Sequence, residues 1–168
     1  MDLRSRRRIG VMGPGSSPPE MDALAREVGY LIARKNAILI CGGLGGVMEA
    51  SARGAREGGG ITVGILPGDR AEDANPYIDI PIVTDLGNAR NAINVLTSQA
   101  IIAIDGSYGT LSEIALALKC GVPVVGLGTW GMVSPGGERL PITLVNTAQE
   151  AVHAALSLIS DCGLRITD

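Results

Sequence analysis

The sequence of 168 residues contains no phenylalanine, and its one tryptophan and three tyrosines bring the aromatic share to only 2%. A core without aromatic rings must be filled by aliphatic side chains, and β-branched strands packed against alanine-rich helices provide such thin layers. Apolar residues make up 46% of the chain, enough for one well-buried core, whereas a second full domain would be cramped at this length. The composition therefore favours a single α/β domain.

Histidine is nearly absent, which limits the catalytic chemistry. The single histidine, His153, has Glu150 and Ser157 as helical neighbours and is expected on a solvated face. This argues against a Ser-His-Asp or Cys-His centre and against a histidine-based metal site. The three cysteines lack the close pairing of zinc ligands and are expected to be reduced thiols of a cytosolic protein: Cys41, Cys120 and Cys162. We therefore expect no metal site.

Lysine is equally scarce, since Lys35 and Lys119 are the only two and both fall at the ends of expected helices. A Walker-type triphosphate site needs a lysine in its glycine-rich loop, and a pyridoxal phosphate decarboxylase needs one as the Schiff base. Neither lysine is placed for these roles. Nucleoside triphosphate hydrolysis and lysine decarboxylation are both excluded on this ground.

The net charge of −3 is unevenly spread, because four arginines crowd the first eight residues. We interpret residues 1–8 as a flexible basic tail and residues 9–168 as the single domain. No further basic stripe or stacking aromatics follow, so a nucleic-acid partner is not expected. Glycine and proline interrupt the apolar stretch after the tail, and no run is long enough to span a membrane. The chain is thus expected in the cytoplasm.

Short apolar runs alternate with amphipathic stretches along the chain. Strands are expected at residues 8–13, 37–41, 61–66, 80–84, 100–105, 123–127 and 142–145. Helices are expected at residues 19–35, 46–57, 88–97, 110–120 and 148–160, with the small side chains of the second packing on the sheet. This order predicts an α/β, three-layer doubly wound Rossmann-like fold, with a mostly parallel sheet of about seven strands and helices on both faces.

Three glycine clusters fall at carboxyl ends of expected strands, where open parallel sheets bind their ligands. They contain the residues proposed to bind a phosphate: Gly13, Gly15 and Ser16; Gly42, Gly43, Gly45 and Gly46; Gly106, Ser107, Tyr108, Gly109 and Thr110. Glycine lets backbone N–H groups approach an anion at a helix N-terminus, although tight turns between strand and helix also need it. None of the clusters spells G-x-G-x-x-G, which excludes the dinucleotide fingerprint.

The segment 105–113, Asp-Gly-Ser-Tyr-Gly-Thr-Leu-Ser-Glu, is the most informative. One interpretation is structural, because Thr110 and Glu113 have the spacing of a capping box at the start of a helix. A glutamate in the first helical turn would also stand at the mouth of the ligand crevice, so the two roles can coexist.

This segment, with Arg90 twenty residues before Thr110 and the loop from Gly42 to Met48, resembles the LONELY GUY phosphoribohydrolases, proteins long labelled lysine decarboxylases. The resemblance spans residues 9–129. It implies that Arg90 and Glu113 are the catalytic pair acting on the N-glycosidic bond of a nucleoside 5′-monophosphate, releasing base and ribose 5-phosphate. It also implies a phosphate held by residues 106–110, no required cofactor, and a homo-oligomer, either dimer or tetramer.

The sequence departs from the pattern of that family at Asp105 and Ser107, where proline and glycine are typical, and at Asn91, where lysine is typical. In these positions the chain looks closer to a sister branch that includes molybdenum-cofactor carrier proteins. That resemblance implies a carrier or sensor that binds the molybdenum cofactor, a pterin phosphate, or a nucleotide without turnover. Hydrolysis and carriage both remain open at this stage.

Overall fold

The computed structural model describes residues 3–163 and, within them, one parallel sheet of seven strands in the order β4-β3-β2-β1-β5-β6-β7. The strands are β1 (Arg8–Met12), β2 (Ile38–Cys41), β3 (Ile61–Leu66), β4 (Ile80–Val83), β5 (Ala100–Ile104), β6 (Val124–Leu127) and β7 (Ile142–Val145). The sheet grows outward in both directions from the neighbours β1 and β5. These two strands therefore form the switch point of a doubly wound sheet.

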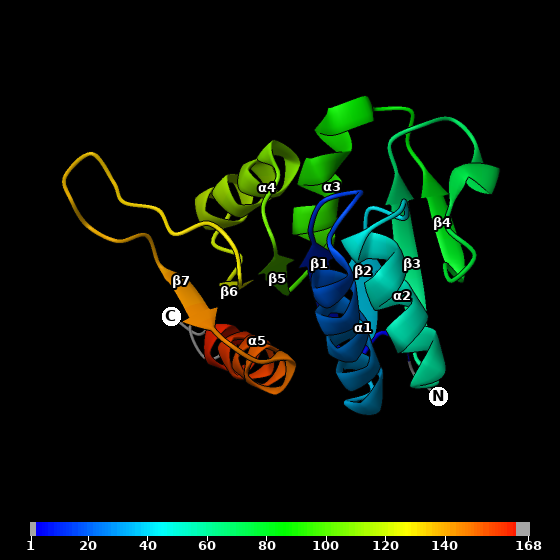
Figure 1. The fold of residues 1–168 in the computed structure, drawn as a ribbon, viewed down its shortest axis with the longest axis horizontal. Helices are drawn as coiled ribbons and strands as arrows, with labels where there is room; N and C mark the ends of the chain where they lie inside the picture. The colour runs from blue at the N-terminus through cyan, green and yellow to red at the C-terminus, as the bar shows by residue number, and fades with distance from the viewer. Residues whose placement is uncertain (1–2, 164–168) are drawn as a thin grey trace.

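Five α-helices within the same residues cover the two faces of this sheet (Figure 1). They are α1 (Pro19–Arg34), α2 (Val47–Glu57), α3 (Arg90–Thr97), α4 (Tyr108–Lys119) and α5 (Ala148–Gly163). Side chains of α1, α2 and α5 share one buried cluster with the sheet, whereas α3 and α4 pack on its other face. The predicted three-layer doubly wound fold is confirmed.

The core is aliphatic, as the composition predicts. The central strands β1, β2, β5 and β6 are almost wholly buried, and β5 has all five residues inside. Its largest enclosed side chains are isoleucine, leucine and methionine, among them Ile9, Met12 and Ile102. Strands buried on both faces need continuous rather than alternating apolar sequence, which is what the run Ala-Ile-Ile-Ala-Ile provides.

Three details differ from the sequence prediction. Helix α4 begins at Tyr108, two residues before the predicted start. The stretch between the predicted strands 61–66 and 80–84 contains a 3-10 turn, η1 (Ala71–Asp73), and the predicted helix 88–97 opens with another, η2 (Gly87–Ala89). The small side chains of α2 face another helix as well as the sheet. A Cβ on Gly54 would lie 1.8 Å from the backbone oxygen of Arg26, so its absence lets α1 and α2 approach closely.

The N-terminal arginines are partly in contact with the body. Arg8 opens β1 and donates from Nε to the backbone oxygen of Thr97 at 2.9 Å, and Arg7 donates to Ser160 Oγ at 3.0 Å. The predicted mobility of the tail stays a prediction, and residues 1–2 of the tail and 164–168 of the domain lie outside the described residues. His153 is exposed on α5, as predicted. None of the described helices is both long and apolar enough to cross a membrane.

Candidate functional site

A cleft of about 150 Å³ opens at the carboxyl ends of β1, β2 and β5, at the switch point of the sheet. Its wall includes backbone from all three glycine clusters and side chains from the N-terminal turns of α3 and α4. The lining residues are Val11, Met12, Gly13, Pro14, Gly15, Gly42, Met48, Asn88, Arg90, Asn91, Ser107, Gly109, Thr110 and Glu113. Ligand crevices of open α/β sheets lie at this position.

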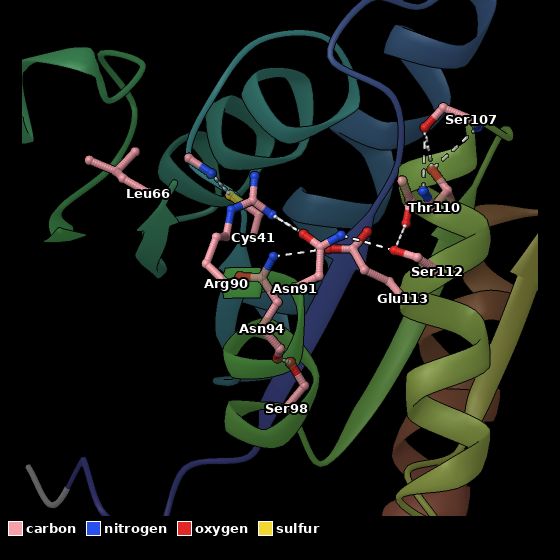
Figure 2. A network of polar contacts seen from close by, with 12 residues as sticks. Cys41, Leu66, Arg90, Asn91, Asn94, Ser98, Ser107, Thr110, Ser112 and Glu113 are labelled. Carbon is pink, nitrogen blue, oxygen red and sulfur yellow. Dashed lines mark hydrogen bonds and ion pairs between the residues drawn. The ribbon is translucent and has the colours of Figure 1, made fainter. Parts of the chain in front are cut away.

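Arg90 and Glu113, the pair predicted to be catalytic, face each other across this cleft (Figure 2). Arg90 is the first residue of α3, and its Nη1 lies 3.6 Å from Glu113 Oε1 on α4. The same Nη1 donates to Asn91 Oδ1 at 2.7 Å. Both charged side chains are about nine-tenths buried. An ion pair with so little water around it keeps its geometry, and its electrostatic effect on a ligand is little screened.

Glu113 is also held from below by Asn94, a fully buried side chain on α3. Asn94 Nδ2 donates to Glu113 Oε1 at 3.0 Å, and Ser98 Oγ in turn donates to the backbone oxygen of Asn94 at 2.8 Å. Within the described residues no donor contacts the second carboxylate oxygen, Oε2. One oxygen of Glu113 is therefore anchored and the other is available to a ligand.

Burial acts on the charges of this pair more strongly than their mutual attraction does. The pKa of Glu113 is raised above its usual range by burial, which the hydrogen bond from Asn94 and the charge of Arg90 oppose. Burial likewise lowers the pKa of Arg90, and Glu113 opposes that shift. A raised carboxyl pKa means that Glu113 takes up a proton at a higher pH than a solvated glutamate does.

Cys41 lies beneath the cleft at the end of β2. Its thiol accepts a hydrogen bond from the N–H of Gly43 at 3.4 Å. Burial raises the pKa of Cys41 to about 11, despite the lowering effects of that N–H and of the charge on Arg90. The thiol therefore stays protonated at neutral pH and acts as a packing group, not as a nucleophile.

Most glycines of the three clusters have a packing reason for being glycine. Gly46 has a φ of +60°, and a Cβ there would lie 2.4 Å from the backbone oxygen of Pro14. Glycine at this position therefore lets the second glycine loop pack closely against the first. A Cβ on Gly42 would lie 2.6 Å from Arg90 Nη2, and one on Gly106 would lie 2.7 Å from Trp130 Nε1. Gly13 is similarly enclosed by the side chain of Val47. For these four positions the turn explanation suffices.

At Gly15 and Gly109 neither packing nor backbone conformation requires a glycine. Neither has a left-handed φ, and a Cβ would meet only Met48 Cε at 3.8 Å in one case and Ser107 Oγ at 3.5 Å in the other. Both line the cleft. Because alanine would fit the protein itself at both positions, the open space beside them is the feature that a side chain would destroy. These two glycines are therefore the ones that point to a ligand.

The start of α4 supplies free backbone donors next to Gly109. Its N-cap is Ser107, whose hydroxyl accepts from the N–H of Thr110 at 3.3 Å, while Thr110 Oγ1 accepts from the N–H of Ser107 at 3.4 Å. Among the described residues, no acceptor contacts the N–H groups of Tyr108 and Gly109. Two adjacent amides at the positive end of a twelve-residue helix thus remain for an anion.

This cap corrects the predicted capping box of Thr110 and Glu113. Ser107 has the extended backbone of an N-cap, with φ of −105° and ψ of 172°, so the helix begins two residues earlier and Thr110 becomes its third residue. Glu113 then lies beyond the cap and turns into the cleft. Glu113 therefore has no role in the cap, which Ser107 and Thr110 form, and only its candidate chemical role remains.

Several predicted ligand residues lie outside the lining of the cleft. They are Ser16, Gly43, Gly45, Gly46, Gly106 and Tyr108, the last with 85% of its surface exposed. Sequence reasoning in turn missed the asparagines that surround Arg90 and Glu113. Asn88 and Asn91 line the cleft, and Asn94 anchors Glu113. Their spacing of three residues along one helical stretch was a signal, because it places amides on the face where a core helix is normally apolar.

No cluster of histidine, cysteine, aspartate or glutamate in residues 3–163 has the arrangement of a metal site. The donors that converge on the cleft are backbone amides, side-chain amides, an arginine and a carboxylate. This donor set suits a phosphate and the hydroxyls or ring edges attached to it.

A doubly wound parallel sheet with a cleft at its switch point defines the class of Rossmann-like α/β proteins. Within that class, residues 6–156 match the model of the SLOG cluster4 family, and the chain belongs to this family.

Two relatives are similar to this chain in sequence. An uncharacterized protein of Archaeoglobus fulgidus is 54% identical over 151 residues, which cover 89% of this chain and 95% of the relative. The cytokinin riboside 5′-monophosphate phosphoribohydrolase of Mycobacterium tuberculosis is 38% identical over 122 residues, which cover 67% of this chain and 65% of that enzyme.

Two solved structures match nearly end to end. The molybdenum cofactor binding protein of Rippkaea orientalis superposes with a TM-score of 0.84 at 38% identity, covering 92% of this chain and 98% of the other. The molybdenum cofactor carrier protein of Chlamydomonas reinhardtii superposes with a TM-score of 0.81 at 38% identity, covering 92% of this chain and 99% of the other. The predicted place in the LONELY GUY superfamily, on the side of the molybdenum-cofactor carrier proteins, is confirmed.

Proposed function

We propose that the protein binds the phosphate end of a small phosphorylated molecule in the cleft between α3 and α4. The observation that carries the proposal is the pair Gly15 and Gly109, which line the cleft without any packing or backbone need for glycine. The free N–H groups of Tyr108 and Gly109, the dipole of α4 and the charge of Arg90 supply the attraction for an anion.

The ligand that best fits these features is a pterin phosphate such as the molybdenum cofactor, held as cargo. Support comes from end-to-end similarity to two proteins whose names state that they bind or carry that cofactor. The cleft has room for a phosphate and the atoms next to it, since 150 Å³ is below the usual range of sites that enclose a whole ligand. The ring system would then extend beyond the cleft, where a carrier can hand it on.

Hydrolysis of a nucleoside 5′-monophosphate is the second candidate, favoured by the buried pair of Arg90 and Glu113. The free Oε2 of Glu113 would stabilise positive charge on the sugar as the base leaves, or orient the attacking water. Arg90 would hold the substrate in place. This chemistry needs neither histidine nor metal, which agrees with the residues that the cleft contains.

Two measurements separate these functions. The protein is incubated with a panel of nucleoside 5′-monophosphates and free base is measured by chromatography, and binding of a pterin phosphate is measured by calorimetry. Base release that disappears in Glu113→Gln supports the hydrolase. Micromolar pterin phosphate binding without base release supports the carrier. Turnover that is unchanged in Glu113→Gln rules out the hydrolytic mechanism described above.

The phosphate assignment itself is tested with Gly15→Ala and Gly109→Ala. Both variants are expected to fold and to bind the phosphorylated ligand at least tenfold more weakly, because a methyl group would occupy the space of the phosphate oxygens. Unchanged affinity in both variants would contradict the assignment.

A further inference from the structure

We propose that Asp105 is a built-in competitor of the phosphate, one that weakens anion binding at the start of α4 and so makes the ligand releasable. This inference rests on the proposed function and adds to it the residue that sets the affinity. It starts from the position of Asp105, directly after β5 and two residues before the N-cap of α4.

The carboxylate of Asp105 already occupies one of the loop amides. Asp105 Oδ1 accepts from the N–H of Gly106 at 2.7 Å. The residue has a left-handed backbone with a φ of +58°, a conformation that aspartate adopts more readily than most residues with a side chain. The hydroxyl of Thr129 donates to its backbone oxygen and holds the turn in place. In this conformation the carboxylate reaches the N–H of Gly106.

Five consecutive amides, from Gly106 to Thr110, belong to this loop and the first turn of α4; Ser107, Gly109 and Thr110 line the cleft, and Gly106 and Tyr108 are their chain neighbours. Three of them are engaged within the protein: Gly106 by Asp105, Ser107 by Thr110 Oγ1, and Thr110 by Ser107 Oγ. The N–H groups of Tyr108 and Gly109 remain. The protein therefore engages three of the five backbone donors itself, and one of the acceptors is a carboxylate.

Two effects of Asp105 act in the same direction. It removes the Gly106 N–H from the ligand, and it places a negative charge next to the two amides that are left. A phosphate dianion is repelled by that charge more strongly than a monoanion is. The result is a cradle that binds a phosphate with moderate strength, which suits a protein that passes its ligand on.

The experiment compares Asp105→Gly and Asp105→Asn with the natural protein, using inorganic phosphate and ribose 5-phosphate as probes. Asp105→Gly removes the charge, frees the Gly106 N–H and suits the left-handed backbone. Asp105→Asn removes the charge but keeps an acceptor for that N–H. We expect affinity on the order of tenfold higher in Asp105→Gly and a smaller gain in Asp105→Asn, measured by calorimetry.

Asp85→Gly is the matched control. Asp85 is an exposed aspartate with a φ of +52° after β4, so its replacement changes the net charge and relieves the backbone in the same way, away from α4. No gain in affinity is expected in this variant. An equal gain would assign the effect to net charge and overturn the proposal.

Amide NMR shows which backbone N–H groups respond to phosphate. In the natural protein phosphate is expected to shift the resonances of Tyr108 and Gly109 and to leave Gly106 unchanged, whereas in Asp105→Gly the Gly106 resonance moves as well. If the natural protein binds the probes and Asp105→Gly binds them no better, this inference alone is wrong. If neither protein binds a phosphate at any of these amides, the proposed function is wrong too.

Discussion

Asn94 Nδ2 lies 3.0 Å from Glu113 Oε1 and joins two helices that the chain connects through a strand. Its amide is fully buried, and its Oδ1 has no partner among the described groups. A buried amide with one half unsatisfied is costly, and the bond that its other half donates to Glu113 offsets part of that cost. This bond, drawn in Figure 2, fixes the carboxylate, and it lowers the pKa of Glu113 against the effect of burial.

Replacing Asn94 by leucine is therefore expected to raise the pKa of Glu113 further, since burial remains and a donor to the ionised form is lost. Glu113 then takes up its proton at a higher pH. The measurement is a ¹³C-carboxyl NMR titration, and if the protein turns over nucleotides, the acid limb of its pH profile should move to higher pH as well.

Ser98→Ala is the control for Asn94→Leu, because it removes a buried hydroxyl that bonds the backbone of Asn94 and does not touch Glu113. It is expected to lower stability without moving the titration of Glu113. A titration that is the same in Asn94→Leu and in the natural protein would show that Asn94 has no influence on the carboxylate.

Gly109→Ala is expected to separate stability from binding. Gly109 is the second residue of α4, and alanine in a helix is more stable than glycine by up to about 1 kcal/mol. For a protein of this size such a gain raises Tm by about 2–4 °C. Binding of the phosphorylated ligand should fall in the same variant. Gly131→Ala is the control, since nothing lies within 4 Å of a Cβ there and the residue does not line the cleft.

Ser107→Ala tests the corrected cap of α4. Loss of the N-cap hydroxyl is expected to lower the free energy of unfolding by about 1 kcal/mol, measured by urea denaturation. Ser112→Ala removes a hydroxyl from the same helix without touching the cap and should cost less. A loss in Ser107→Ala no greater than that in Ser112→Ala would contradict the assignment of the cap to Ser107.

The cysteines are expected to differ in reactivity. With a pKa of about 11 and no exposed surface, Cys41 should resist alkylation in the folded protein at pH 8, whereas the exposed Cys120 should react. Peptide mass spectrometry after a short treatment with iodoacetamide distinguishes the sites. Rapid labelling of Cys41 without unfolding would show that the base of the cleft opens.

The sequence by itself determined the architecture. Continuous apolar runs such as 100–104, alternating with helical stripes, leave few arrangements other than a parallel sheet with helices on both faces, and the glycine clusters mark the edge where its ligand binds. Arg90 and Glu113 were predicted from the resemblance of the sequence to a family pattern. No physical argument from the sequence required these two side chains to be in contact. That part of the site was within reach of sequence reasoning.

Only the tertiary structure decided which of these residues act together. The sequence could not distinguish Gly109 from Gly46, because the difference is whether a neighbouring loop or open space lies where a Cβ would be. Nor could it assign the cap to Ser107 instead of Thr110, since both fit the local pattern and the choice depends on where β5 ends and the helix starts. The bond from Asn94 to Glu113 depends on two helices packing on the same face of the sheet, a contact between elements that no local pattern encodes.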